Sequence, residues 1–255
     1  MKKSILKYRY NEDLEFNVEK PQIITILGNS NNRILNNLLW NNKKGNIFVD
    51  EIEVNDANFY KYHQDVSFIL YKQLNIFIGE TVSDEIAFGL ESLGISRNDI
   101  HEIITREARI FNLTDKLEKD PNSLGSNDKA LVKILSAMII NPKIIVLENI
   151  LSELDYEDYE KIKKIFNEYI KKGGTIINIT NNVEEALIGS RTIVVCDMKV
   201  VCDDKTAKVM TEEKLLKRLG IGLPFIIELN KYLIDYALID KYYMDYGKMV
   251  KEIWK

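Results

Sequence analysis

The sequence predicts an α/β fold with a mainly parallel sheet, a helical subdomain and a small C-terminal helical extension. Short apolar, β-branched runs alternate with amphipathic stretches along most of the chain, which is the pattern of strands alternating with helices. The stretch from about 77 to 142 is mostly helical within this alternation, and it predicts the helical subdomain. We therefore expect an α/β domain over residues 1–210 and a helical extension over residues 211–255.

Buried strands are indicated wherever a short apolar run lies between polar turns. The first run is followed by the polar segment Gly28–Asn32 and then by helical spacing from Ile34 to Trp40, which gives a strand, a turn and a helix. Two neighbouring runs near residue 200 predict a β-hairpin. The expected strands are Ile23–Leu27, Ile47–Val49, Val66–Leu70, Lys143–Leu147, Thr175–Ile179, Thr192–Cys196 and Lys199–Cys202.

Caps and helix-breaking residues mark the expected helix ends. Thr81 and Ser96 each precede an aspartate three positions further on, a capping pattern that starts a helix. Asn141-Pro142 ends one helix because proline cannot continue it, and Gly173-Gly174 ends another. The expected helices are Thr81–Leu93, Ser96–Phe111, Lys129–Ile140, Glu153–Lys172, Val183–Ile188, 211–219, 223–236 and 247–254.

The composition excludes several classes of protein. With 35 basic and 39 acidic residues the net charge is -4, which argues against a nucleic-acid partner. Cys196 and Cys202 flank a predicted turn without a CxxC or Cys/His grouping, so we expect free thiols. The segment Met1–Lys7 lacks the apolar core of a signal peptide, and no apolar run approaches the roughly 20 residues that span a bilayer. Any action at a membrane would therefore require docking to a spanning partner.

The order of these elements resembles that of the ABC ATPases. Among them, the sequence is similar to the ATP-binding subunits of energy-coupling factor (ECF) and cobalt-type transporters. Phe77–Ser96 resembles a stretch that these subunits carry after the Q-loop, Leu135–Leu147 resembles the run into the Walker B motif, and Leu219–Leu229 resembles the ECF C-terminal region. The start Tyr8-Arg-Tyr10 resembles the A-loop, whose aromatic residue stacks on adenine; packing or surface roles for both tyrosines stay open. The resemblance implies a P-loop NTPase-like ABC fold.

In this chain, the loop at the phosphate-binding position departs from the Walker A pattern of the family. The Walker A motif G-x-x-x-x-G-K-[ST] cradles phosphate with backbone N–H groups, and its Ser/Thr hydroxyl holds Mg²⁺. Aligned without a gap, Arg33 falls on the second glycine, Ile34 on the lysine and Leu35 on the hydroxyl; a one-residue deletion moves Arg33 to the lysine. Either way the metal ligand is missing, and from Gly28 to Gly45 the chain is shorter than the family spacing. The resemblance makes the candidate nucleotide contacts Tyr10, Gly28, Asn29, Ser30, Asn31, Asn32 and Arg33.

The positions that activate water are also altered. Walker B should end in an aspartate followed by a catalytic glutamate, and this chain has Glu148 and Asn149. Glu148 keeps a carboxylate that remains a candidate Mg²⁺ ligand, whereas Asn149 cannot accept a proton at neutral pH. The switch histidine position is Asn181. The Q-loop glutamine position falls on Tyr71 or Lys72.

The signature motif, which meets the nucleotide of a partner subunit, is degenerate, while the D-loop is retained. The serine of the signature motif is displaced by one position, to Ser126, and Asn127 occupies a glycine position. Asp128 is expected to bring negative charge toward a triphosphate. The signature and D-loop candidates are Leu124, Gly125, Ser126, Asn127, Asp128 and Asp155. One lost electrostatic contact costs roughly 10²–10³ in rate, and a lost base about 10²–10⁴. Several are altered together, so we expect this chain's own hydrolytic site to be inactive.

These residues are compatible with three functions. The leading hypothesis is a catalytically impaired cassette that pairs with a second ATP-binding subunit, as a homodimer or heterodimer. It would dock to an integral membrane coupling subunit, peripheral at the cytoplasmic face of the cell membrane. The first alternative is an active ATPase in which Arg33 replaces the lysine and Glu148 holds Mg²⁺. The second is a non-transport ABC-like regulatory module. ATP binding stays open, and Mg²⁺ binding lacks its usual hydroxyl ligand.

Overall fold

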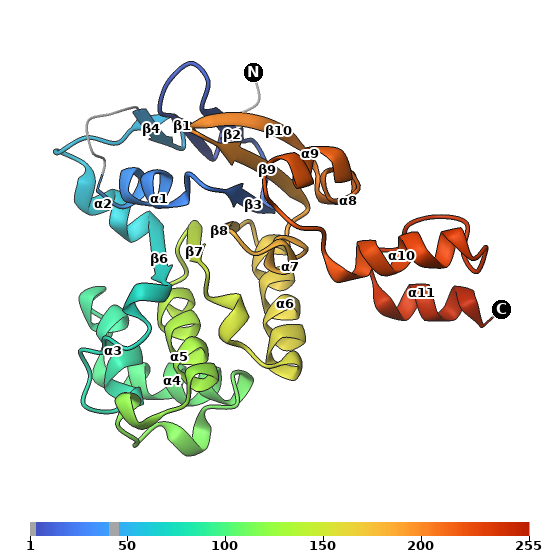
Figure 1. Cartoon of the computed structure of the whole chain (residues 1–255). Helices are drawn as coiled ribbons and strands as arrows, with labels where there is room; N and C mark the ends of the chain where they lie inside the picture. The colour runs from blue at the N-terminus through green and yellow to red at the C-terminus, as the bar shows by residue number, and fades with distance from the viewer. Residues whose placement is uncertain (1–3, 41–45, 255) are drawn as a thin grey trace. The chain divides into compact units, whose positions relative to one another are not determined.

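The computed structural model describes residues 4–40 and 46–254 and confirms the predicted α/β fold (Figure 1). Gly45, which marks the end of the short Gly28–Gly45 spacing, lies outside this range. So do the first three residues of Met1–Lys7, the segment considered as a signal peptide. The larger sheet has the strand order β10-β9-β3-β8-β7-β6, in which β3 pairs with β9 and β6 with β7 in parallel, and β9 with β10 antiparallel. Its strands are β3 Ile23–Gly28, β6 Val66–Leu70, β7 Ile144–Glu148, β8 Thr175–Thr180, β9 Arg191–Cys196 and β10 Lys199–Lys205.

A smaller sheet forms from segments that the sequence only partly indicated. Its order is β2-β1-β4-β5, and β4 and β5 pair antiparallel. Asp50 and Glu51, which connect these two strands, both adopt positive φ, as a two-residue hairpin turn requires. The strands are β1 Leu6–Arg9, β2 Glu15–Val18, β4 Asn46–Val49 and β5 Ile52–Glu53.

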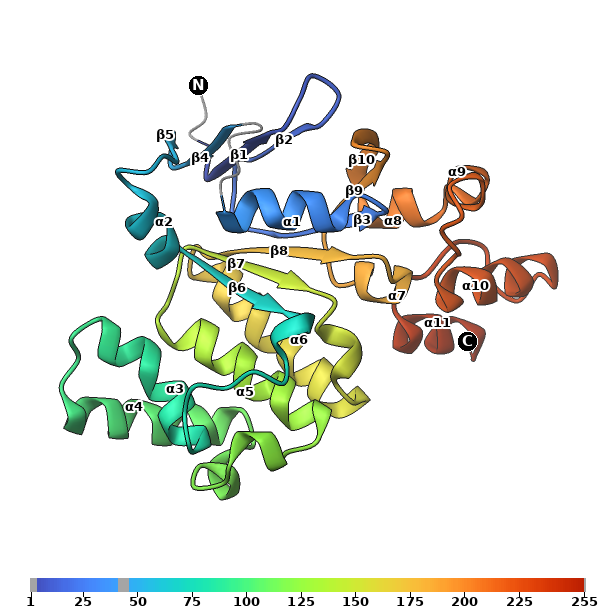
Figure 2. The ribbon, with the colours of Figure 1, turned by 60° about the vertical axis from the view of Figure 1, so that its left-hand side comes forward.

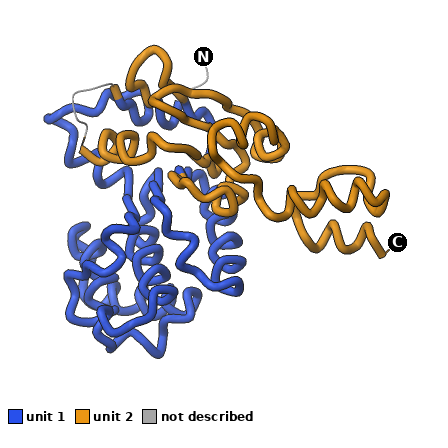
Figure 3. The backbone as a smooth tube through the Cα atoms, in the orientation of Figure 1, with its two compact units in different colours: residues 1–7, 17–21, 47–177 blue, residues 8–16, 22–46, 178–255 orange. Residues whose placement is uncertain are grey.

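The chain divides into two compact units, each built from separate segments (Figure 3). Unit 1 comprises Met1–Lys7, Asn17–Pro21 and Ile47–Ile177, and unit 2 comprises Tyr8–Phe16, Gln22–Asn46 and Asn178–Lys255. The expected division into domains at residue 210 stays a prediction.

Unit 1 contains the helical subdomain, in which α3, α4 and α5 pack on one another (Figure 2). The capping box of Thr81 with Asp84 is present, and Ser96 caps the next helix. Helix α6 begins at Tyr156, later than the expected Glu153, because Asp155 caps it by accepting the Asp158 N–H. The helices are α2 Phe59–Asp65, α3 Val82–Ser92, α4 Arg97–Ile110, α5 Ser126–Ile139 and α6 Tyr156–Lys171, with short 3₁₀ turns at Tyr71–Gln73, Thr114–Lys116, Pro121–Ser123 and Leu151–Glu153.

In unit 2 the C-terminal helices share a core with the strands. Ile226 and Ile227 pack in one buried cluster with Leu27 of β3 and Val194 of β9. The sequence did not indicate α8, which follows β10 directly. The helices of this unit are α1 Asn31–Trp40, α7 Val183–Ala186, α8 Thr206–Met210, α9 Glu213–Arg218, α10 Phe225–Asp235 and α11 Tyr246–Ile253.

Hydrogen bonds connect the C-terminal helices to one another and to α7. The Asn230 amide of α10 donates to the Tyr243 carbonyl at 2.8 Å and accepts from the Tyr243 N–H at 2.8 Å, just before α11. Glu184 of α7 accepts the N–H of Phe225 at 2.6 Å, so a carboxylate lies at the α10 N-terminus, where it is stabilising. Among the described ranges, no helix combines the length and apolar character needed to cross a bilayer.

Candidate functional site

The turn after β3, where the sequence places the phosphate loop, is very short. β3 ends at Gly28, and only Asn29 and Ser30 precede α1. The predicted helical segment Ile34–Trp40 is confirmed, and the helix begins three residues earlier, at Asn31. A Walker A loop needs five residues between its first glycine and its lysine, and here three of the corresponding residues are helical.

The side chains of this turn bind the β9–β10 hairpin. Asn29 donates to the Asp197 carboxylate at 3.1 Å and accepts the Asp197 N–H at 2.9 Å. The Ser30 hydroxyl accepts the Met198 N–H at 2.9 Å. Asp197 and Met198 have φ of 48° and 62°, as a two-residue hairpin turn requires. The polar groups of the turn therefore already have partners within unit 2.

Gly28 is required by the packing of neighbouring strands. Its φ is +145°, and a Cβ built there would lie 1.9 Å from the carbonyl oxygen of Val195 on β9. Residues 29–32 are not among those with positive φ, so the turn after Gly28 forms without left-handed asparagines. Arg33 is exposed, whereas Ile34 and Leu35, at the lysine and hydroxyl positions, are 0% and 7% exposed.

The Walker B position ends β7 with a carboxylate that is buried and hydrogen-bonded. Glu148 is 6% exposed. Its Oε2 accepts the N–H of Tyr71 at 3.0 Å, and its Oε1 accepts the side-chain amide of Asn149 at 3.1 Å. The structure thus brings the Walker B position, the catalytic-base position and one of the two Q-loop positions together in unit 1.

The signature residues and the D-loop are joined by hydrogen bonds. Asn127 accepts the N–H of Asp155 at 2.9 Å and donates to the Asp158 carboxylate at 2.8 Å. Asp128 forms an ion pair with Lys116 at 2.6 Å. Lys116 thus lies beside the charge of Asp128, and the expectation that Asp128 brings negative charge toward a triphosphate stays a prediction. Leu124 and Gly125 precede α5, and Ser126 is its exposed first residue.

The remaining candidates lie in unit 2. Tyr8 is fully buried and stacks on Phe16 with ring centroids 5.0 Å apart, so it is a core residue. Tyr10 is half-buried and directly follows β1. Asn181 is exposed directly after β8, and Asn182 caps α7. The switch and phosphate-loop positions thus belong to unit 2, and the Walker B and signature positions to unit 1.

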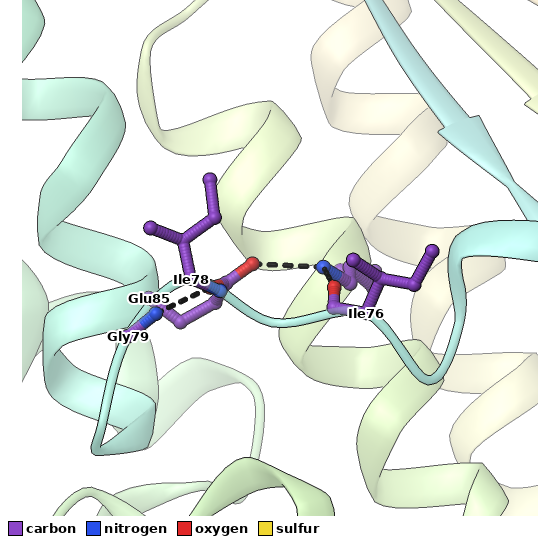
Figure 4. Close-up of polar contacts among 5 residues, drawn as sticks. Ile76, Ile78, Gly79 and Glu85 are labelled. Atoms are coloured by element: carbon purple, nitrogen blue, oxygen red, sulfur yellow. Dashed lines mark hydrogen bonds and ion pairs between the residues drawn. The ribbon is translucent and has the colours of Figure 1, made fainter.

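A loop between β6 and α3 is held by a charged pair that the sequence did not single out. The Glu85 carboxylate of α3 accepts the N–H groups of Ile78 at 2.8 Å and Gly79 at 3.1 Å (Figure 4). Lys133 of α5 pairs with Glu85 at 2.8 Å and donates to the Ile76 carbonyl at 2.5 Å. The lone lysine in the apolar run of α5 is the signal that would have identified it.

The stabilising contribution of Glu85 is expected to disappear in acid. Burial raises the pKa of Glu85. The hydrogen bonds from Lys133, Gly79 and Ile78 together lower this pKa by more than burial raises it, so the pKa lies below its ordinary value of 4.5. A lowered folded-state pKa gives stability that is complete above the unfolded pKa and is lost as the pH falls through the folded one. The difference in unfolding free energy between the wild type and Glu85→Gln should shrink below about pH 4.5 in urea titrations.

The exposed Glu91 on the same helix gives the matched control for this titration. Glu91→Gln should leave the unfolding free energy within about 0.5 kcal/mol of the wild type, because the exposed Glu91 carboxylate makes no hydrogen bond or ion pair with any residue that the structure describes. A Glu85→Gln difference that stays constant from about pH 7 to pH 3 would contradict the charged pairing.

Comparison with known proteins gives the family. No protein-family model matches the chain. It is 28% identical over 228 residues to the energy-coupling factor transporter ATP-binding protein EcfA1 of Mycoplasmopsis synoviae, covering 87% of this chain and 85% of that protein. It is 30% identical over 237 residues to the energy-coupling factor transporter ATP-binding protein EcfA of Pediococcus pentosaceus, covering 90% of this chain and 82% of that protein. The chain belongs to the ECF transporter ATP-binding proteins.

Solved structures agree with this ECF assignment at the level of the fold. The structure of cbiO1 from Clostridium perfringens, part of an ABC transporter complex, matches with a TM-score of 0.72 at 19% identity, covering 90% of this chain and 99% of that one. A dimeric ATP-binding cassette in a post-hydrolysis state, bound to ADP and Pi, matches with a TM-score of 0.69 at 20% identity, covering 79% and 98%. The predicted ABC ATPase fold is confirmed.

Within this ECF cassette, no metal cluster and no disulfide is formed by the residues that the structure describes. Over 4–40 and 46–254, no three or more histidine, cysteine, aspartate or glutamate side chains are grouped to hold an ion. Cys196 and Cys202 are free thiols, as the sequence indicated.

Proposed function

We propose that this chain is a catalytically impaired ATP-binding-cassette subunit of an ECF-type transporter. It pairs with a second ATP-binding subunit and docks to an integral membrane coupling subunit at the cytoplasmic face of the cell membrane. Membership of the ECF family supports the transporter role. The observation that carries the loss of catalysis is the short turn after Gly28, whose side chains bind the β9–β10 hairpin.

A metal-bound triphosphate does not fit the residues of this turn. A phosphate cradle needs a run of free backbone N–H groups in a loop, and here the N–H of Asn29 is directed at the Val195 carbonyl at 3.3 Å. Aligned without a gap, the lysine and hydroxyl positions carry Ile34 and Leu35, whose side chains are buried. With a one-residue deletion Arg33 takes the lysine position and Ile34 the hydroxyl position, so the Mg²⁺ ligand is missing in both alignments. An apolar side chain supplies neither charge nor a Mg²⁺ ligand.

The carboxylate that remains at the Walker B position is also engaged. Both oxygens of Glu148 accept hydrogen bonds, from Tyr71 and from Asn149. Each oxygen thus has one lone pair engaged at a buried site, and an ion would have to share the carboxylate with these contacts or displace them, which costs about 1.5–3 kcal/mol for each lost hydrogen bond to a charged group. The neighbouring Asn149 cannot serve as the general base.

The signature end of α5 supports a weakened contribution to a partner's site as well. Asn127 is held by Asp155 and Asp158, and Asp128 by Lys116. The effects of such losses on the rate are not additive. Even so, a missing base and missing charge stabilisation together lower the rate of hydrolysis by a factor of roughly 10⁴ or more. The subunit would serve a structural or regulatory role in the dimer.

A titration with a fluorescent ATP analogue, with and without Mg²⁺, tests this proposal. We expect no Mg²⁺-dependent micromolar binding and no steady phosphate release by the purified chain. The Pediococcus pentosaceus ATP-binding protein, assayed identically, is the positive control for nucleotide binding. Micromolar, Mg²⁺-dependent binding with sustained phosphate release would instead establish an active ATPase with atypical residues.

Co-purification from detergent tests the transporter role separately. The tagged chain, co-expressed with the membrane-spanning subunit and second ATP-binding subunit of its transporter, should elute with both. A chain that elutes alone at every detergent tested would be a regulatory module outside a transporter.

A further inference from the structure

The β4–β5 hairpin, α2 and the residue before β7 enclose a small cavity in unit 1. Its volume is about 50 Å³, and every residue that lines it belongs to that unit. Asp65 directly precedes β6 and Lys143 directly precedes β7, so the cavity lies at the amino ends of these two strands (Figure 2). Glu148 ends β7 at its carboxyl end. The cavity is therefore separate from the Walker B position.

The walls of this cavity are largely apolar. Val49, Val54 and Tyr62, which line it, are 7%, 5% and 3% exposed. A single water needs roughly 10–15 Å³ of such space, so the cavity holds about four water-sized groups. Water gains little there because apolar walls offer it few hydrogen-bond partners. Pockets for drug-sized ligands measure roughly 300–1,000 Å³, so the space suits a short branched alkyl group.

Two aspartates that line the cavity share one lysine. The Lys143 ammonium lies 2.6 Å from Oδ2 of Asp50 and 3.2 Å from Oδ2 of Asp65. The hydrogen bond with Asp50 is the largest influence on the pKa of Lys143 and raises it above the ordinary 10.5, so the lysine stays charged at neutral pH. The Oδ1 atom of each aspartate makes no hydrogen bond or ion pair with any residue that the structure describes. Two carboxylate oxygens thus remain available at the cavity.

Lys61 brings the remaining charge to the lining. It lies one turn before Asp65 on α2 and is exposed, and its ammonium has no partner within the described ranges. The lining therefore carries two carboxylates and two ammonium groups, with no net charge. A bound cation would leave Lys61 unmatched, and a bound anion would leave the aspartate oxygens unmatched. A ligand with one charge of each sign matches both.

We propose that this cavity binds a small zwitterion, an α-amino acid with a short branched apolar side chain. The ligand's ammonium group donates to the available oxygens of Asp50 and Asp65, its carboxylate pairs with Lys61, and its alkyl group packs against Val54 and Tyr62. Such a ligand connects the β4–β5 hairpin to α2 and stabilises unit 1 by mass action. The inference depends neither on nucleotide binding nor on a transport role.

Titration of the full ¹⁵N-labelled chain with L-valine, followed by NMR chemical shifts at pH 7, tests the site. We expect saturable shifts at Val49–Val54 and Asn58–Asp65, with a dissociation constant on the order of 1 mM for a ligand of this size. Isobutylamine lacks the carboxylate of valine, isovalerate lacks its ammonium group, and glycine lacks its alkyl group. Each should bind at least about tenfold more weakly than valine, because one of the three contacts is missing.

Substitutions assign the two charged ends. Lys61→Met should weaken valine binding about tenfold and leave isobutylamine binding within about twofold of the wild type, because isobutylamine has no carboxylate. Lys164→Met is the matched control: Lys164 is an exposed lysine of α6 without a partner among the described residues, and valine should bind this variant like the wild type. Asp50 has a φ of 50°, which asparagine tolerates, so Asp50→Asn keeps the hairpin turn and should weaken both valine and isobutylamine.

Three results would overturn the proposal. The absence of saturable shifts at about 20 mM valine, or shifts confined to residues away from the cavity, would exclude the site. Isobutylamine or isovalerate binding within about twofold of valine would show a site for a single charge instead of a zwitterion. Unchanged valine affinity in Lys61→Met would exclude Lys61 as the partner of the ligand's carboxylate.

Discussion

Gly28→Ala is expected to destabilise the protein by roughly 3–5 kcal/mol, or to prevent folding altogether. The added methyl group would lie 1.9 Å from the Val195 carbonyl oxygen, and Gly28 has a φ of +145° that alanine rarely adopts. Strand β9 cannot move away without breaking its parallel pairing with β3, so the strain has no inexpensive release. Urea denaturation followed by circular dichroism measures the change in unfolding free energy.

This substitution distinguishes two roles for the glycine. If Gly28 served only to let phosphate approach the backbone, alanine would change nucleotide binding and leave the unfolding free energy nearly unaltered. Gly222→Ala is the matched control in the same unit, because a Cβ there meets nothing within 4 Å. It should alter stability by no more than about 0.5 kcal/mol. A wild-type unfolding curve for Gly28→Ala would refute the packing role.

Asn230→Asp is expected to release α11 from α10 at a local cost of roughly 2–4 kcal/mol. Asn230 is fully buried, and its amide donates to the Ile226 and Tyr243 carbonyls while accepting the Tyr243 N–H. Aspartate keeps the acceptor, removes both donors and places a charge where no water reaches. Hydrogen exchange of the Tyr243 amide and of α11 should accelerate while the strands stay protected.

An exposed asparagine provides the comparison. Asn36 lies on the solvent side of α1, and Asn36→Asp should leave exchange and stability within about 0.5 kcal/mol of the wild type. Unchanged protection of α11 in Asn230→Asp would show that the apolar contacts of Ile226 and Ile227 hold the C-terminal helices without the amide.

Much of the fold follows from local sequence patterns. The buried strands β3, β6, β7 and β8 are short apolar runs between polar turns, and their positions are as predicted to within a residue or two. The capping residues Thr81 and Ser96 fixed the starts of α3 and α4 because a side-chain cap acts within four residues. Short or polar elements such as β1, β2, β5, α2 and α8 lack a periodic signal, so they were missed or only partly indicated.

At the candidate site, the sequence predicted much less than it did for the fold. The sequence identified which positions had changed, because a motif is a matter of residue identity and spacing. It could not show that Asn29 and Ser30 bind Asp197 and Met198, which lie more than 160 residues away along the chain. Nor could it show the ion pair of Asp128 with Lys116, which depends on how the turn Thr114–Lys116 lies beside α5.

The sequence by itself determined the family, the strand–helix order and the absence of a lysine and a hydroxyl at the phosphate loop, because these depend on local periodicity and on residue type. Only the tertiary structure decided what the altered residues do. Gly28 fits against Val195, and Lys133 and Glu85 hold the loop between β6 and α3, because contacts between distant segments form only when the chain has packed. Side-chain partners of this kind are set by three-dimensional proximity, which single-sequence patterns do not encode.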